Sequence, residues 1–150
     1  MGRVITLVRQ DEAKMERVYG LAYEIKPENV RKTFDYLNFR EKCGYTMHEV
    51  TFHPCHELTG DENNNRAPFK CVCYFANEDN FYYSAEQDKE KMSAQIADTI
   101  GPSGSNREYL FNFCSALRNL VLSECKLDKN ILDYDRHIFE LEDLVKKSIK

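Results

Sequence analysis

The spacing of the apolar residues along this 150-residue chain shifts near residue 87, and this shift is the strongest constraint on its fold. Before that point, most short runs alternate apolar and polar residues and are separated by turn-forming residues, which is typical of β-strands; one helical pattern lies among them. Beyond it, apolar residues recur three or four positions apart, which is typical of amphipathic helices. Because four strands come first and three helices last, with one helix inside the strand region, the pattern predicts an α+β fold rather than alternating βαβ units.

The predicted elements can be given as ranges. Strands are expected at residues 3–8, 18–25, 44–54 and 69–76, and helices at residues 28–42, 87–100, 105–121 and 131–145. Ser105 and Glu108 have the spacing of a capping box, so we expect the third helix to begin there. The GPSG sequence before it is interpreted as a turn between helices, because it lacks the lysine and the preceding strand of a phosphate-binding loop.

Length and composition exclude several classes of protein. A chain of this length suits one domain, which buries roughly 70% of its unfolded surface. The chain is 42% hydrophobic and 31% charged, with a net charge of −4. That composition is globular rather than disordered, and its mild acidity argues against nucleic acid as a partner. No apolar run approaches the length of a membrane span, and no secretory signal precedes the first strand, so we expect a cytoplasmic protein.

The six cysteines do not predict a metal site. In a cytosolic protein they are expected to be reduced thiols. Cys71 and Cys73 lack the spacing and the second cysteine pair of a zinc site, and we take them to lie on opposite faces of a strand. A cluster of His48, His53 and neighbouring residues is the alternative, but a strand end running into a loop is the preferred interpretation. We therefore expect neither metal nor cofactor.

Glu41 is the first candidate for chemistry. At about 100° per residue, it falls within about 20° of Val30 on a helical stripe that also carries Phe34 and Leu37. A carboxyl group partly removed from water shifts toward its neutral form, which suits a group that accepts a proton and returns it. The alternatives are a solvated helix end or a buried glutamate paired with an arginine or tyrosine. Periodicity alone favours these structural explanations over catalysis.

Four sequence motifs instead favour a catalytic role for Glu41 over the structural explanations. GRVITLV, VYGLAYEI, YLNFREKCGY and QIADTIGPSGSNREYLFNF occur in this order, and FREK-x-GY and GPSG-x-N-x-EYLF are the specific ones. Together they resemble the ChaC-like family of glutathione-specific γ-glutamylcyclotransferases, over about residues 2–145. The resemblance implies a small, curved mixed sheet or barrel with surrounding helices. It also implies that Glu41 is the catalytic acid/base.

The implied reaction cuts glutathione into 5-oxoproline and cysteinylglycine without water, metal or cofactor. The α-amino group of the γ-glutamyl residue attacks its own γ-carbonyl carbon, and the cysteinylglycine amine leaves. One carboxyl group, that of Glu41, can take the proton from the attacking amine and deliver it to the leaving amine. By the same resemblance, Tyr109 is expected to orient the substrate, with a core tyrosine whose hydroxyl is hydrogen-bonded as the alternative. Arg3 could neutralise a substrate carboxylate, but a solvated arginine at a strand end is the preferred interpretation.

The chain departs from the family pattern at its beginning. The glycine-containing YGSL word that holds the γ-glutamyl group in the family is missing, so we expect a single γ-glutamylcyclotransferase-like domain over residues 1–150 that is N-terminally incomplete. The alternative function is a non-catalytic or truncated homologue that binds a γ-glutamyl compound or a protein. A missing core strand would expose a sheet edge, through which the chain could self-associate.

Overall fold

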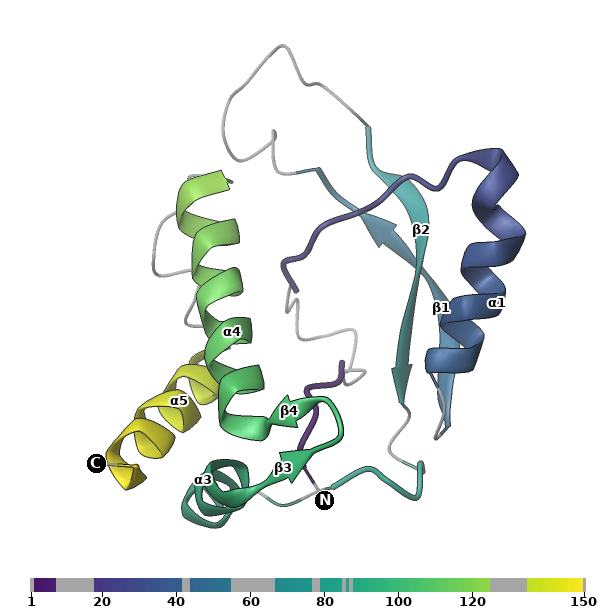
Figure 1. The fold of residues 1–150 in the computed structure, drawn as a ribbon. Coiled ribbons are helices and arrows are strands. Elements are labelled where there is room, and N and C mark those ends of the chain that lie inside the picture. Colours follow the sequence, from purple (N-terminus) through teal and green to yellow (C-terminus); the bar gives the residue numbers. More distant parts are fainter. Residues whose placement is uncertain are drawn as a thin grey trace.

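The computed structural model describes residues 2–7, 18–41, 44–54, 67–76, 79–84, 86, 88–124 and 135–149. Its strands are β1 (Tyr45–Phe52), β2 (Phe69–Ala76) and two very short ones, β3 (Ile100–Gly101) and β4 (Gly104–Ser105). Its helices are η1 (Pro27–Asn29), α1 (Val30–Arg40), α3 (Lys89–Asp98), α4 (Asn106–Arg118), η3 (Asn119–Glu124) and α5 (Arg136–Ser148). Figure 1 shows α1 beside the β1–β2 hairpin on one side of the molecule and α3, α4 and α5 on the other.

The first helix forms where the sequence predicts it. Pro27 opens the short η1 turn with its fixed backbone angle, and Glu28 supplies the acidic first turn. α1 follows directly and ends at Arg40, after which Gly44 adopts a left-handed backbone angle of φ 83°. Glycine has no Cβ and reaches that conformation at little cost, so it can redirect the chain from α1 into β1.

The two long strands pair in an antiparallel hairpin. Tyr45 lies opposite Ala76 and Phe52 opposite Phe69, so the pairing runs along the whole of β1. One face carries His48, which stacks on Phe75 with ring centroids 3.7 Å apart. The other face meets α1, where the Tyr74 hydroxyl donates to Asn38 Oδ1 at 2.8 Å.

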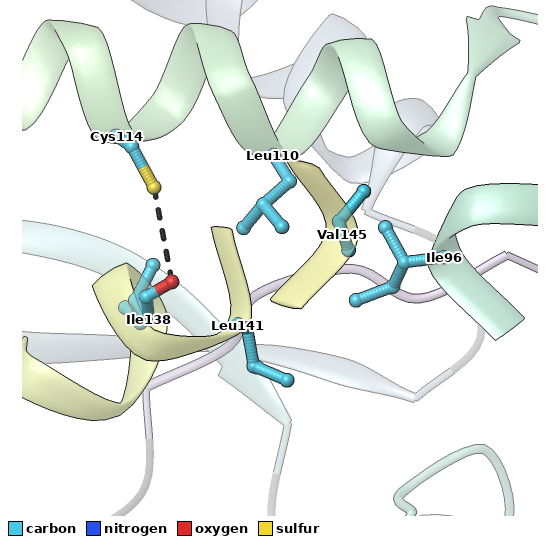
Figure 2. Packing of buried hydrophobic residues seen from close by; sticks show 6 residues of the cluster. All are labelled: Ile96, Leu110, Cys114, Ile138, Leu141 and Val145. Carbon is cyan, nitrogen blue, oxygen red and sulfur yellow. Dashed lines mark hydrogen bonds between the residues drawn. The ribbon is translucent and has the colours of Figure 1, made fainter. Parts of the chain in front are cut away.

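The main core lies between the three long helices. Figure 2 shows its apolar side chains projecting from α3, α4 and α5 toward one another. Cys114 and Val145 are fully buried there, and the Cys114 thiol donates to the Ile138 carbonyl at 3.9 Å. Burial raises the pKa of the Cys114 thiol to about 11, so it behaves as a packing residue. The remaining members of this cluster are Ile96, Leu110, Ile138 and Leu141.

Two of the four predicted strands do not form in the described residues. Residues 2–7 and 18–25 run as non-helical segments without a paired strand. The first is held by side chains of α4, which take the place of a neighbouring strand. The second contacts the helices through Tyr19, which packs on Leu117 and Val121, while most of its other residues are exposed. Both segments have the apolar pattern of a strand. Neither has, among the described residues, the neighbouring backbone to which a strand must hydrogen-bond.

The start of α4 is also built differently from the prediction. Ser105 does occupy the position before the helix, but its side chain makes no capping hydrogen bond. Ser105 instead pairs with Ile100 in the small β3–β4 hairpin, whose turn is closed by Gly104 at φ 118°. The GPSG sequence is thus a tight turn between α3 and α4, as its composition indicated. The first part of the last predicted helix, residues 131–134, lies outside the described residues.

Candidate functional site

Glu41 caps the C-terminal end of α1. Its backbone N–H still donates to the Leu37 carbonyl at 2.7 Å, while its own backbone angles have left the helical region. The residue is half-buried, whereas Arg40 beside it is exposed, with its guanidinium 5.8 Å from the Tyr36 ring centroid. Within the described residues, the Glu41 carboxylate takes part in no hydrogen bond or ion pair. The carboxylate is thus not committed to a structural partner there.

The loop that begins at residue 79 lies against the turn that follows Glu41. Gly44 is in contact with the Asn80 side chain so closely that a Cβ at position 44 would collide with its amide group. Asn80 in turn organises its own loop, because its Oδ1 accepts from the Tyr82 N–H at 2.7 Å and its carbonyl from the Tyr83 N–H at 2.9 Å. This contact brings the aromatic residues 81–83 into the neighbourhood of the α1–β1 turn.

Tyr109 lies on the first turns of α4 and faces the N-terminal segment. Its hydroxyl oxygen accepts a hydrogen bond from the Ile5 backbone N–H at 3.3 Å. Burial of the ring raises the pKa of Tyr109, the Ile5 N–H offsets part of this, and the nearby Tyr45 phenol raises it again. Tyr109 is 40% exposed, so part of the residue is accessible to a ligand. A phenol that accepts from the backbone retains its own O–H as a donor.

Arg3 is fixed at both its backbone and its side chain. The backbone N–H and carbonyl are bound by Asn106, and Nε donates to Gln95 Oε1 of α3 at 2.8 Å. The terminal guanidinium nitrogens make no hydrogen bond within the described residues. The interpretation of Arg3 as a freely solvated strand-end side chain is therefore wrong, since its Nε is anchored.

The structure brings two of the three predicted site residues together. Arg3 and Tyr109 are linked by the N-terminal segment. Asn106 of α4 binds the backbone of Arg3, and the Tyr109 hydroxyl binds the backbone N–H of Ile5, two residues further along the segment. Glu41 lies at the C-terminal end of α1, and no hydrogen bond or ion pair among the described residues joins it to either Arg3 or Tyr109. Its link to Tyr109 runs through Tyr45, which begins β1 four residues later.

Sequence reasoning missed two residues that hold this region. Asn106 and Gln95 contact Arg3 directly, but neither was a candidate. Asn106 could have been found, because it is the asparagine of the specific motif GPSG-x-N-x-EYLF. A buried asparagine at the start of a helix needs partners for both its donor and its acceptor.

The two strand cysteines share a face, so the expectation that they lie on opposite faces is wrong. Side chains two residues apart in a strand point the same way. Cys71 lies opposite Val50, and Cys73 lies opposite His48. Burial and the neighbouring Cys71 thiol both raise the pKa of Cys73. Across the described residues, no three histidine, cysteine or acidic side chains are grouped as they would be to hold a metal ion.

The apolar content of the helices is also informative. Among the helices that the structure describes, none has the length and continuous apolar character needed to cross a bilayer.

The fold is thus a mixed α+β arrangement that presents an uncommitted carboxylate at the end of α1 and a partly exposed phenol on α4. This chain belongs to the ChaC-like protein family, whose family model matches residues 1–148. The glutathione-specific gamma-glutamylcyclotransferase of Schizosaccharomyces pombe is 31% identical over 161 residues, covering 99% of this chain and 71% of that protein. The human glutathione-specific gamma-glutamylcyclotransferase 1 is 34% identical over 119 residues, covering 78% of this chain and 49% of that protein.

Solved structures give the same relationship. A yeast γ-glutamylcyclotransferase specific to glutathione superposes with a TM-score of 0.61 at 28% sequence identity, covering 82% of this chain and 56% of that one. This similarity supports the mixed α+β class assigned above. The chain spans about half the length of the human and zebrafish relatives that it matches.

Proposed function

We propose that this chain degrades glutathione by intramolecular cyclisation of the γ-glutamyl group, releasing 5-oxoproline and cysteinylglycine. The observation that carries the proposal is Glu41, the glutamate of the FREK-x-GY word, which is half-buried at the end of α1 without a structural partner among the described residues. Family membership supports the same chemistry, since the relatives above are named for it.

In the proposed mechanism, Glu41 acts first as a base and then as an acid. Its carboxylate removes a proton from the substrate α-ammonium group, and the resulting amine attacks the γ-carbonyl carbon. A new C–N bond closes the five-membered ring, while the bond from that carbon to the cysteine nitrogen breaks. Glu41 then returns its proton to the departing cysteinylglycine amine. The ring nitrogen loses its second surplus proton as the bond breaks, and the same carboxylate passes this proton to the leaving amine, which departs as an ammonium group. No water is consumed, so the two products together contain all the atoms of glutathione.

Tyr109 and Arg3 are proposed to hold the substrate. Tyr109 can donate its hydroxyl proton to a substrate oxygen, because the Ile5 N–H already occupies the acceptor side of that hydroxyl. Arg3 can face a substrate carboxylate with its terminal nitrogens, because only its Nε is engaged by Gln95. Fixing the extended γ-glutamyl arm so that amine and carbonyl meet contributes an entropic part of the acceleration.

We also propose that residues 1–150 act as one γ-glutamylcyclotransferase-like domain built on a small curved sheet or barrel, of which the β1–β2 hairpin is one part. The contacts between the N-terminal segment and both halves support a single unit. Thr6 Oγ1 accepts from the Ala76 N–H of β2 at 3.3 Å, and Ile5 packs on the helical core.

The test is Glu41→Gln, which keeps the size of the side chain and removes its proton transfer. We expect cysteinylglycine release to fall by about 10²–10⁴-fold, the usual contribution of a general acid–base group, with unchanged thermal unfolding. Glu28→Gln is the matched control, because Glu28 is an exposed glutamate at the opposite end of the same helical segment.

Two outcomes would count against the proposal. Undiminished turnover by the Glu41→Gln protein would remove this residue from the mechanism. A folded wild-type chain that releases no cysteinylglycine at all would instead favour the alternative function, binding of a γ-glutamyl compound or a protein partner.

A further inference from the structure

The N-terminal segment is held by side chains that imitate a neighbouring β-strand. Asn106 Oδ1 accepts from the Arg3 N–H at 2.7 Å, and Asn106 Nδ2 donates to the Arg3 carbonyl at 2.7 Å. This is the two-bond exchange that a hydrogen-bonded pair of residues makes in an antiparallel sheet. The next backbone N–H on that edge, from Ile5, is taken by the Tyr109 hydroxyl.

Asn106 is well suited to this task by its own placement. It is buried, it is the first residue of α4, and its backbone N–H donates to the Thr99 carbonyl at 2.9 Å. Its carboxamide therefore projects from a point fixed by both the helix and the β3–β4 hairpin. Gly2 packs directly against it, where a Cβ would lie 3.2 Å from Asn106 Oδ1.

Asn106 and Tyr109 are three residues apart and thus lie on the same side of α4. Asn106 fixes the segment at Arg3, and the fixed segment presents the Ile5 N–H to the Tyr109 hydroxyl two residues later. That hydrogen bond sets the direction in which the remaining O–H of Tyr109 can donate. We propose that Asn106 is a positioning residue, whose carboxamide orients the Tyr109 hydroxyl through the N-terminal segment.

This inference rests on the proposed function only where it concerns catalysis. The carboxamide itself touches no reacting atom, and the Arg3 guanidinium is held separately by Gln95, so the effect of Asn106 on turnover is expected to pass through Tyr109. Leucine has nearly the same shape as asparagine but can neither donate nor accept, whereas aspartate keeps the acceptor for the Arg3 N–H and loses the donor for its carbonyl.

The first test measures amide hydrogen exchange and needs no enzymatic activity. In Asn106→Leu we expect the Arg3 and Ile5 amides to exchange about tenfold faster, the change that loss of one hydrogen bond can produce. Asn106→Asp should give an intermediate rate at both positions. Asn112→Leu, an exposed asparagine of the same helix, is the matched control and should leave both rates unchanged.

The exchange result has a clear contrary outcome. If Asn106→Leu accelerates exchange of the Arg3 amide but leaves exchange of the Ile5 amide as slow as in the wild type, then Asn106 does not fix the hydrogen bond between the Ile5 N–H and Tyr109. That result would overturn the inference. The Cys114 amide, in the middle of α4, reports whether the variant remains folded. If the leucine variant unfolds, the aspartate variant decides the question by the same two rates.

The second test is a double-mutant cycle with glutathione as substrate. Asn106→Leu should lower kcat/KM about tenfold in the wild-type background but less than twofold in the Tyr109→Phe background, because it acts through that hydroxyl. Equal losses in both backgrounds would overturn the inference. A wild-type chain without turnover would contradict the proposed function alone, since the exchange rates would still report on Asn106.

Discussion

At the scale of single residues, backbone geometry and side-chain contacts are set together around the candidate site. Gly44 illustrates this, because its left-handed backbone and its contact with Asn80 both require the absence of a Cβ. Glu41 lies three residues earlier, so the same turn determines where its carboxylate is presented. Gly44 follows the helix predicted at residues 28–42, where a glycine typically ends a helix, but nothing in the sequence indicated that this glycine also contacts a distant loop.

Replacing Gly44 with alanine is expected to destabilise the fold by about 1–2 kcal/mol, the usual cost of a left-handed angle in a residue with a Cβ. The collision with Asn80 adds to this. The measurement is urea unfolding, with Gly20→Ala as control because a Cβ at Gly20 meets no atom within 4 Å. Equal midpoints for the two variants would show that this turn does not need a glycine.

At the scale of elements, the buried carboxylate of Glu142 joins α5 to α4 by an ion pair. The Glu142 side chain of α5 is 4% exposed and pairs with Arg118 of α4 and with Lys146, at 2.8 Å, one turn along α5. Arg118 also lies over the Phe139 ring, 4.5 Å from its centroid. Burial by itself raises the pKa of Glu142, but the hydrogen bonds from Arg118 and Lys146 outweigh it and leave this pKa below its usual value.

This arrangement predicts a pH dependence of folding. A carboxyl group with a lowered pKa in the folded state stabilises the fold above its unfolded pKa, about 4.3, and the contribution is lost as the pH falls through the folded value. Glu142→Gln should cost about 2 kcal/mol at neutral pH, since hydrogen bonds to a charged group are weakened. The variant should also lose less stability than the wild type between neutral pH and pH 3.

Chemical unfolding at several pH values provides the measurement. Glu140→Gln is the control, because Glu140 also pairs with a lysine, Lys89, but that pair is solvent-exposed and should contribute less. If both glutamine variants behave alike at every pH, the buried pairing of Glu142 does not stabilise the helical layer.

The elements show why some of the structure was predictable. β2 has the predicted bounds, and α1, α3 and α4 lie within a few residues of theirs, because each buries or pairs through its own periodic pattern. Residues 2–7 and 18–25 carry the same alternation, yet a strand also needs a backbone partner. That partner is a long-range property: Asn106 is 103 residues away from Arg3 along the chain. The meeting of Ile5 with Tyr109 was unpredictable for the same reason.

At the scale of the whole molecule, the N-terminal segment connects the two sides of the fold. Arg3 is bound to α3 and α4, whereas Thr6 is bound to the end of β2. In the described residues the long strands pair only with each other, and Val72 is 43% exposed on β2. By contrast, α3, α4 and α5 bury their apolar side chains against one another.

The exposed hairpin supports the hypothesis that two copies associate through its edge. We expect the apparent mass in light scattering to rise with protein concentration, and Val72→Lys to prevent the rise, because charged residues on an exposed strand oppose pairing. Lys70 already lies on this strand, paired with Glu49 at 3.6 Å. A single monomeric mass at all concentrations would contradict the hypothesis without affecting the proposed chemistry.

The central claim is that one carboxyl group, that of Glu41, promotes attack by the substrate on itself. The most direct measurement is mass spectrometry of the products formed from glutathione in ¹⁸O-labelled water. We predict 5-oxoproline and cysteinylglycine in equal amounts, with no ¹⁸O incorporated during cleavage, and release of both products about 10²–10⁴-fold slower in the Glu41→Gln protein. Glutamate carrying ¹⁸O in place of 5-oxoproline would show that water is the nucleophile, and it would contradict the claim.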